Sequence, residues 1–272
     1  MEKIKKALEK AREQRGEQTQ ASAATEGRPA PGVDAEESTI NYSRTKVVPI
    51  DEAVLKRNKI VAGSGTDGAA TAYKILRTQV QQRLDAKEWN ALAVTSPGAN
   101  QGKTLTAINL AVALAREVHR TVLLVDLDLI RPSIHSAFEL EIEKGLVHYL
   151  TGDVPITEVL VNPGIERLVI LPAGTSTQRS SELLSSPKMA KLVEELKSRY
   201  PSRIIIFDLP PILSTDDALA FAPYVDTTLL VVEDGATSKD ELARAVQVLE
   251  GVHLLGTVLN KSDDVAPTYY GS

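Results

Sequence analysis

The sequence contains no cysteine, which excludes a disulfide framework, a thiolate zinc site and a cysteine nucleophile. It also lacks long hydrophobic runs. Runs such as Val122–Val125 and Ile204–Phe207 are far shorter than the roughly 20 residues that cross a bilayer. The N-terminus is basic but has no continuous apolar segment, so we expect no secretory signal. These absences predict a soluble cytoplasmic protein.

Basic residues are also fewer than acidic residues. The 272 residues include 31 Lys and Arg against 36 Asp and Glu, which gives a net charge of −5. This balance argues against a protein that binds nucleic acid through bulk positive charge. Hydrophobic residues make up 43% of the chain, enough for a core, so disorder of the whole chain is excluded. The length allows one large domain or two small ones.

The first 60 residues differ in composition from the rest. Residues 2–15 have apolar residues at three- and four-residue spacing and a local charge of +3, which predicts a short amphipathic helix. This helix is either a solvated terminal helix or a docking helix for a membrane surface or a partner. Residues 16–39 are rich in small and polar residues, which indicates a disordered linker. Residues 40–60 are mixed and are expected to pack as an extended strap.

From about residue 70 onward, short aliphatic runs alternate with helical patterns. Buried strands separated by helices are typical of a parallel sheet that is covered on both faces. The expected strands are residues 91–95, 121–125, 168–171, 203–207, 227–232 and 254–259, and the expected helices are residues 70–86, 103–117, 187–199, 215–222 and 238–250.

The strongest functional signal is the segment Thr95–Thr104, which reads TSPGANQGKT. It follows an expected strand and opens an expected helix, the context of a phosphate-binding loop (P-loop). Backbone N–H groups there can surround phosphate oxygens, Lys103 can reach the β- and γ-phosphates, and Thr104 can offer its hydroxyl to Mg²⁺. The formal pattern asks for glycine at position 97, where this chain has proline. An ordinary glycine-rich helix start is the alternative.

Three aspartates at expected strand ends support the first interpretation. Asp126 and Asp128 follow one aliphatic run, and Asp208 follows another. In open parallel sheets, ligands bind outside the carboxyl ends of the strands. Carboxylates there suit a divalent ion that bridges phosphates, whereas helix capping is the alternative for each one taken singly. We therefore predict a three-layer, doubly wound α/β fold of the P-loop NTPase type with a mainly parallel sheet.

The motifs together resemble the bacterial tyrosine kinases that accompany capsule and exopolysaccharide export, and most of all the exosortase-associated tyrosine autokinases. The resemblance covers roughly residues 65–270. Its specific stretches are the loop at Gly98–Thr104, then Leu123–Pro132 and Ile205–Pro211. By resemblance these are the Walker A, Walker A′ and Walker B motifs.

The resemblance implies an ATP- and Mg²⁺-dependent protein-tyrosine autokinase. Asp126 then orients or deprotonates the attacking tyrosine hydroxyl, while Asp128 and Asp208 hold the Mg²⁺ shell together with Thr104. The catalytic set is Lys103, Asp126, Asp128 and Asp208. The implied nucleotide-binding residues are Gly98, Ala99, Asn100, Gln101, Gly102, Lys103, Thr104, Leu105, Arg131 and Asn260. The implied phosphate acceptors are Tyr269 and Tyr270, in the tail.

The same resemblance divides the chain and suggests partners. We expect an amphipathic helix and linker over residues 1–50, the kinase domain over residues 51–264 and a tyrosine-bearing tail over residues 265–272. The implied partner is a membrane-embedded regulator of polysaccharide chain length, which would hold the protein at the inner face of the cytoplasmic membrane. A homo-oligomer is also implied, and no nucleic acid.

Departures from the family pattern leave alternatives open. The helix motif that packs family members into rings has Thr71, Lys74 and Arg77 here, and Ile130 stands at a position that is often basic. The segment Asn260–Asp263 matches the Asn-Lys-x-Asp element that reads guanine in GTPases, although no glycine follows Asp208 where a GTPase has one. The alternatives are a partition-type ATPase switch and a nucleotide-gated adaptor without kinase activity.

Overall fold

The computed structural model describes residues 45–62, 68–118, 120–200 and 202–262. The helix and linker expected over residues 1–39 lie outside these residues, as do the tail tyrosines, Tyr269 and Tyr270. No helix in the described part of the chain is both long and apolar enough to cross a membrane.

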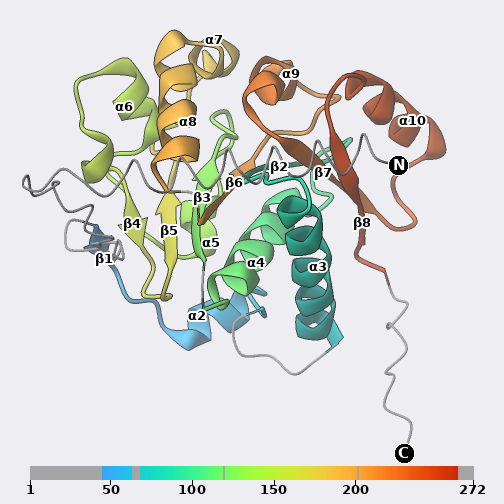
Figure 1. Cartoon of the computed structure of the whole chain (residues 1–272), viewed down its shortest axis with the longest axis horizontal. Helices are drawn as coiled ribbons and strands as arrows, with labels where there is room; N and C mark the ends of the chain where they lie inside the picture. The colour runs from blue at the N-terminus through green and yellow to red at the C-terminus, as the bar shows by residue number, and fades with distance from the viewer. Residues whose placement is uncertain (1–44, 63–67, 119, 201, 263–272) are drawn as a thin grey trace, which may run out of the picture. The chain divides into compact units, whose positions relative to one another are not determined.

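Eight strands of the described residues form one sheet (Figure 1), in the order β1-β4-β5-β3-β6-β2-β7-β8. Neighbouring strands are parallel except β4 and β5, so β1 and β4 run against the other six. The strands are β1 (Lys46–Val47), β2 (Ala91–Thr95), β3 (Thr121–Asp126), β4 (Val161–Asn162), β5 (Leu168–Leu171), β6 (Arg203–Asp208), β7 (Thr227–Glu233) and β8 (Leu254–Asn260).

Some of the helices begin at side-chain caps. Ser186 accepts from Met189 N at the start of α8, and Ser238 and Glu241 form a capping box on α10. The helices are α2 (Glu52–Arg57), α3 (Gly68–Asp85), α4 (Lys103–Ala115), α5 (Ile134–Ala137), α6 (Leu146–Thr151), α7 (Ser180–Leu184), α8 (Pro187–Arg199), α9 (Asp217–Phe221) and α10 (Lys239–Val248), with short 3₁₀ turns at Ile156–Glu158 and Ala222–Tyr224.

The sheet is the middle of three layers. Alternate residues of its central strands, such as Leu92 and Val94 of β2, join the core cluster that includes α3 and α4. The intervening residues face the other way, where the ring of Phe207 lies 4.9 Å from that of Phe221 in α9. Figure 1 shows α7, α8 and α9 on the side opposite to α3 and α4. This arrangement confirms the predicted doubly wound, mainly parallel α/β fold.

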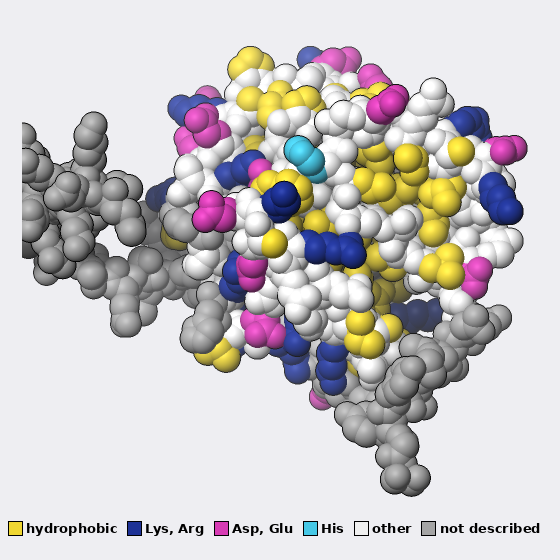
Figure 2. Space-filling model, turned by 45° about the vertical axis from the view of Figure 1, so that its right-hand side comes forward, with side chains coloured by type: hydrophobic (Ala, Val, Ile, Leu, Met, Phe, Trp, Pro, Cys, Tyr) yellow, Lys and Arg dark blue, Asp and Glu magenta, His cyan; other side chains and the backbone are white. Residues whose placement is uncertain are grey.

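Both edges of the sheet depart from a fully buried pattern. The strap expected over residues 40–60 contributes β1, which begins at Lys46, ahead of residue 51, where we expected the kinase domain to start. At the other edge, Leu254 and Leu259 of β8 are exposed, as is Val246 of α10. Hydrophobic side chains gather in a patch on the face of the molecule shown in Figure 2.

The fold brings three strand ends together. Strand β6 lies between β2 and β3, and its last residue, Asp208, is in register with Val94 of β2 and with Asp126 of β3. The loop that follows β2 leads directly into α4. The predicted loop and two of the three predicted aspartates therefore meet at the carboxyl ends of the central strands.

Candidate active site

The loop between β2 and α4 has the backbone of an anion site. Gly102, just before α4, adopts a left-handed conformation with a φ of 90°, and a Cβ there would lie 2.0 Å from Asn260 Nδ2. Only glycine fits this position. The first turn of α4 contains no acidic residue. Its free N–H groups and the positive end of the helix dipole can therefore attract phosphate.

The loop is also held by its own side chains. Ser96 Oγ donates to Gly98 O over 2.7 Å, and Gly98 N donates to Gln101 Oε1 over 3.1 Å. Leu213 N donates to Pro97 O over 3.3 Å, which joins the loop to the segment after β6. Proline at position 97 is therefore accommodated within an ordered turn.

Lys103 and Thr104 both contact carboxylates from the neighbouring strand ends. Lys103 Nζ lies 3.0 Å from Asp128 Oδ2 and 3.4 Å from Asp208 Oδ1. Thr104 Oγ1 donates to Asp208 Oδ2 over 2.6 Å. Lys103, Asp128 and Asp208 are all buried. The structure thus brings together the cation, the hydroxyl and two of the carboxylates that the sequence predicts.

Asp126 is a further buried carboxyl group of this cluster. It has no exposed surface, and its Oδ2 accepts from Ser133 N and Ile134 N over 3.1 and 3.0 Å. Its Oδ1 has no hydrogen-bond partner in the structure. Burial, followed by the charge of Asp208, raises the pKa of Asp126 to about 7. The carboxyl group is therefore close to its midpoint of ionisation at neutral pH.

The electrostatics of the other two groups follow from the same crowding. Burial raises the pKa of Asp208 against the opposing effects of Lys103 and the Thr104 hydroxyl. Burial alone would lower the pKa of Lys103, but the charges of Asp208 and Asp128 outweigh it and raise that pKa. Lys103 therefore stays protonated and supplies the positive charge within the cluster.

A cavity of about 680 Å³ opens over this cluster. Its lining includes seven of the predicted nucleotide-binding residues and Asp128, whereas Gly98, Gln101 and Asn260 are absent from it. The sequence patterns assigned no site role to Ser133, Ser214 or Thr215, which also line the cavity. Their position directly after the aspartate-bearing strand ends is the signal that would have found them. The lining residues are Ala99, Asn100, Gly102, Lys103, Thr104, Leu105, Asp128, Ile130, Arg131, Ser133, Pro210, Pro211, Ser214 and Thr215.

The donor set suits a magnesium ion that is completed by phosphate. Among the described residues, no group of three or more His, Cys, Asp or Glu side chains is arranged to hold a metal ion. The described residues therefore do not form a complete set of metal ligands on their own. Magnesium instead takes one or two carboxylates together with substrate phosphates and water. Asp128, Asp208 and the Thr104 hydroxyl are oxygen ligands of this kind.

Two other predicted residues can be placed. Asn260 lies behind the loop, where its Nδ2 donates to Gln101 O over 2.9 Å. Arg77 of α3 pairs with Glu117 over 3.0 Å.

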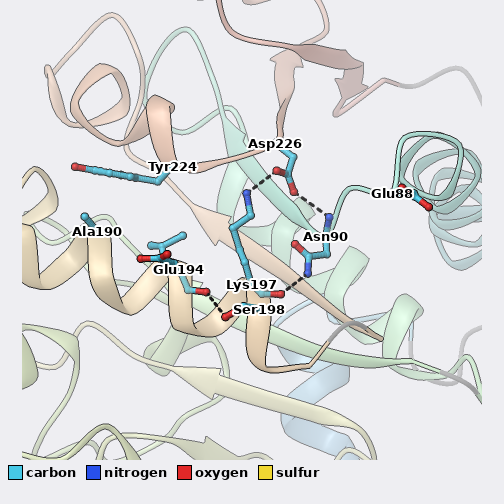
Figure 3. A pocket seen from close by; sticks show the side chains of 9 residues that line it. Glu88, Asn90, Ala190, Glu194, Lys197, Ser198, Tyr224 and Asp226 are labelled. Atoms are coloured by element: carbon cyan, nitrogen blue, oxygen red, sulfur yellow. Dashed lines mark hydrogen bonds and ion pairs between the residues drawn. The ribbon is translucent and has the colours of Figure 1, made fainter.

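A second pocket, of about 470 Å³, lies where β2 and β7 begin (Figure 3). There Lys197 pairs with Asp226 over 2.5 Å, and Asn90 N donates to the same carboxylate over 2.9 Å. These contacts join structural elements, so the cavity over Lys103 is the candidate site.

Comparison with known proteins agrees with this geometry. Residues 92–258 match the family model described as an AAA domain. The tyrosine-protein kinase YwqD of Bacillus subtilis is 32% identical over 208 residues, which is 76% of this chain and 86% of that protein. The tyrosine-protein kinase etk of Escherichia coli K12 is 31% identical over 229 residues. This match covers 84% of the chain but only 30% of the longer relative.

Solved structures give the same result. The kinase domain of Escherichia coli tyrosine kinase ETK superposes with a TM-score of 0.71 at 30% identity, over 84% of this chain and 93% of that one. The chimerical protein CapA2B2 superposes with a TM-score of 0.70 at 27% identity, over 80% and 93%. The septum site-determining protein MinD of Pyrococcus horikoshii, complexed with Mg-ADP, has a TM-score of 0.52 at 23% identity, a likeness of fold alone.

Proposed function

Because the chain belongs to the bacterial tyrosine kinases of the P-loop ATPase superfamily, we propose that it is an ATP- and Mg²⁺-dependent tyrosine autokinase. It transfers the γ-phosphoryl group of ATP to Tyr269 or Tyr270 in the tail of a neighbouring subunit. The observation that carries this proposal is the cluster in which Lys103 contacts Asp128 and Asp208 beneath a cavity.

The residues of the chain have separate tasks in this reaction. The amides of the loop and Lys103 bind the phosphates, and Thr104, Asp128 and Asp208 hold the Mg²⁺. The ion would neutralise phosphate charge when bound. Bound phosphates would compete with the two carboxylates for the ammonium of Lys103, and the carboxylates would then be available as metal ligands. Catalysis rests mainly on positioning and charge neutralisation.

Asp126 is suited to act on the tyrosine hydroxyl. The hydroxyl oxygen forms a new bond to the γ-phosphorus, the bond to the ADP leaving oxygen breaks, and the hydroxyl proton passes to the carboxylate. The unpartnered Oδ1 is the atom that can receive it. Asp126 does not line the cavity, so this contact requires a rearrangement of the groups around it. A pKa of about 7 suits a group that takes and returns a proton near neutral pH.

The wider role that we propose is regulation of exopolysaccharide or capsule synthesis and export. The amphipathic helix within residues 1–50 docks on a membrane-embedded regulator of chain length, and the kinase works as a homo-oligomer. Removal of residues 1–40 should abolish capture of that partner, and unchanged capture would rule out the helix as the dock. Arg77 pairs with Glu117 of the same chain, so we do not assign it a contact between subunits of the oligomer.

The decisive experiment is incubation with Mg-ATP followed by mass spectrometry of the C-terminal peptide. Wild type should acquire phosphate on Tyr269 or Tyr270, and Lys103→Ala should not. Protein that binds ATP but leaves both tyrosines unmodified would overturn the autokinase proposal. ATP hydrolysis without phosphotyrosine would identify a partition-type switch. Competition between ATP and GTP tests which nucleotide base the protein prefers. A clear preference for GTP would overturn the assignment of ATP.

A further inference from the structure

Two consecutive residues at the end of the edge strand hold two consecutive carbonyl oxygens of the nucleotide-binding loop. Asn260 Nδ2 donates to Gln101 O over 2.9 Å, and Lys261 Nζ donates to Asn100 O over 2.7 Å. Lys261 also pairs with Glu233 over 2.9 Å, and the strand register places Glu233 opposite Asn260. The ends of β7 and β8 therefore fix the loop from one side.

The backbone at both ends of the lysine contact is unusual. Asn100 has a φ of 64° and Lys261 a φ of 60°, left-handed values that are uncommon for residues other than glycine. Such conformations persist where the surroundings hold them, and they concentrate at functional sites. The hydrogen bond from Lys261 Nζ to Asn100 O directly joins these two residues. It is therefore placed to hold the loop in its observed shape.

Peptide geometry shows what this shape provides. In a planar trans peptide, the N–H of the next residue points opposite to the carbonyl. The carbonyls of Asn100 and Gln101 are held toward the end of β8. The N–H groups of Gln101 and Gly102 therefore point away from it. Amides of this loop are the groups expected to bind phosphate oxygens.

We infer that Lys261 is a positioning residue that presets the nucleotide-binding loop for phosphate, with Glu233 orienting its ammonium group. This inference rests on the proposed nucleotide binding at the loop. Lys261 does not line the cavity, so it acts through Asn100. The opposing interpretation is the one that the Asn-Lys-x-Asp pattern suggests, in which Lys261 contributes to recognition of the base.

The test measures displacement of a fluorescent ADP analogue by Mg-ATP, Mg-GTP and Mg-tripolyphosphate, which has phosphates but no base. We expect Lys261→Met to weaken all three competitors by the same factor, about tenfold. Lys261→Arg retains the charge and the donor and should restore affinity to within about threefold. Lys239→Met, an exposed lysine at the start of α10, is the matched control and should leave all three affinities unchanged.

The outcomes separate the interpretations. Equal loss for the three competitors, rescued by arginine, supports the positioning role. A loss of affinity that is confined to ATP or to GTP would show that Lys261 contributes to recognition of the base. Unchanged affinity for all three competitors would show that the contact does not contribute to binding. Either result overturns the inference. Thermal melting of each variant identifies unfolding, because a merely destabilised Lys261→Met would lose binding capacity without a uniform change in affinity. Wild type that fails to bind the ADP analogue refutes the proposed function itself.

Discussion

Replacing Asp126 with asparagine is expected to stabilise the protein above neutral pH, although it removes a carboxylate from the candidate active site. Asp126 is completely buried, and its pKa is raised from 3.8 to about 7 by burial and by the charge of Asp208. Its ionised form is therefore disfavoured in the folded protein. An asparagine oxygen can keep the hydrogen bonds from the backbone N–H groups of Ser133 and Ile134.

The sign of the effect follows from proton linkage. Below pH 3.8 the group is protonated in both the folded and the unfolded chain. As the pH rises toward 7, the unfolded chain loses the proton while the folded protein keeps it, so the free energy of unfolding falls. Above a pH of about 7 both states are ionised and the loss is complete. A pKa difference of this size corresponds to about 4 kcal/mol.

The substitution recovers only part of this energy. The new amide nitrogen would take the place of Oδ1, which has no partner, and an unsatisfied buried donor costs about 1–3 kcal/mol. The net gain is therefore about 2 kcal/mol at high pH. Near pH 4.5 only about 1 kcal/mol of the linkage has developed, so the variant should be about 1 kcal/mol less stable than wild type there.

The assay is urea denaturation at pH 4.5, 6 and 8 without nucleotide, with linear extrapolation to zero urea. The difference between the variant and wild type should grow with pH. Replacing the exposed Asp153 with asparagine is the control and should change stability by less than about 0.5 kcal/mol at every pH. A variant that is less stable than wild type at pH 8 would refute the reasoning, since burial of the charge would then not be unfavourable.

Further substitutions test other contacts. Asn109→Ala removes a buried acceptor that two backbone N–H groups share, so the free energy of unfolding should fall by about 2–4 kcal/mol in a urea titration. Asp226→Ala leaves the N–H groups of Asn90 and Ala91 without their acceptor and should reduce stability by about 1–3 kcal/mol. Its affinity for nucleotide should match wild type, because this carboxylate lies at the opposite ends of the strands; a measurable loss of affinity would contradict that separation.

The regular elements were largely predictable because their signals are local. The strands at residues 91–95 and 168–171 and the helix at residues 187–199 have the predicted bounds. A continuous aliphatic run marks a strand that is buried on both faces, and proline after a serine marks a helix start. Strand β4 has two residues and α5 has four, too short for any periodic pattern. Their existence depends on tertiary contacts.

The site was predictable in its members but not in its contacts. Spacing places Lys103 and the three aspartates at strand ends, and the structure brings them together. The sequence does not show that Asp208 is in register with Asp126, because strand order is a property of the whole sheet. For the same reason it does not show that Lys261 reaches the loop from the end of β8, a strand two places away from β2.

The charge balance of the cluster bears on the proposed binding of phosphate and a divalent cation by the same residues. Lys103 is in direct contact with two buried carboxylates, and Asp126 adds a third group nearby. The three carboxyl groups outnumber the single ammonium. Buried charge that is incompletely paired is unfavourable, so a divalent cation is attracted to the oxygens. Phosphate alone would compete for Lys103 and leave the carboxylates unpaired. The geometry therefore favours nucleotide and cation arriving together, each satisfying the group that the other displaces.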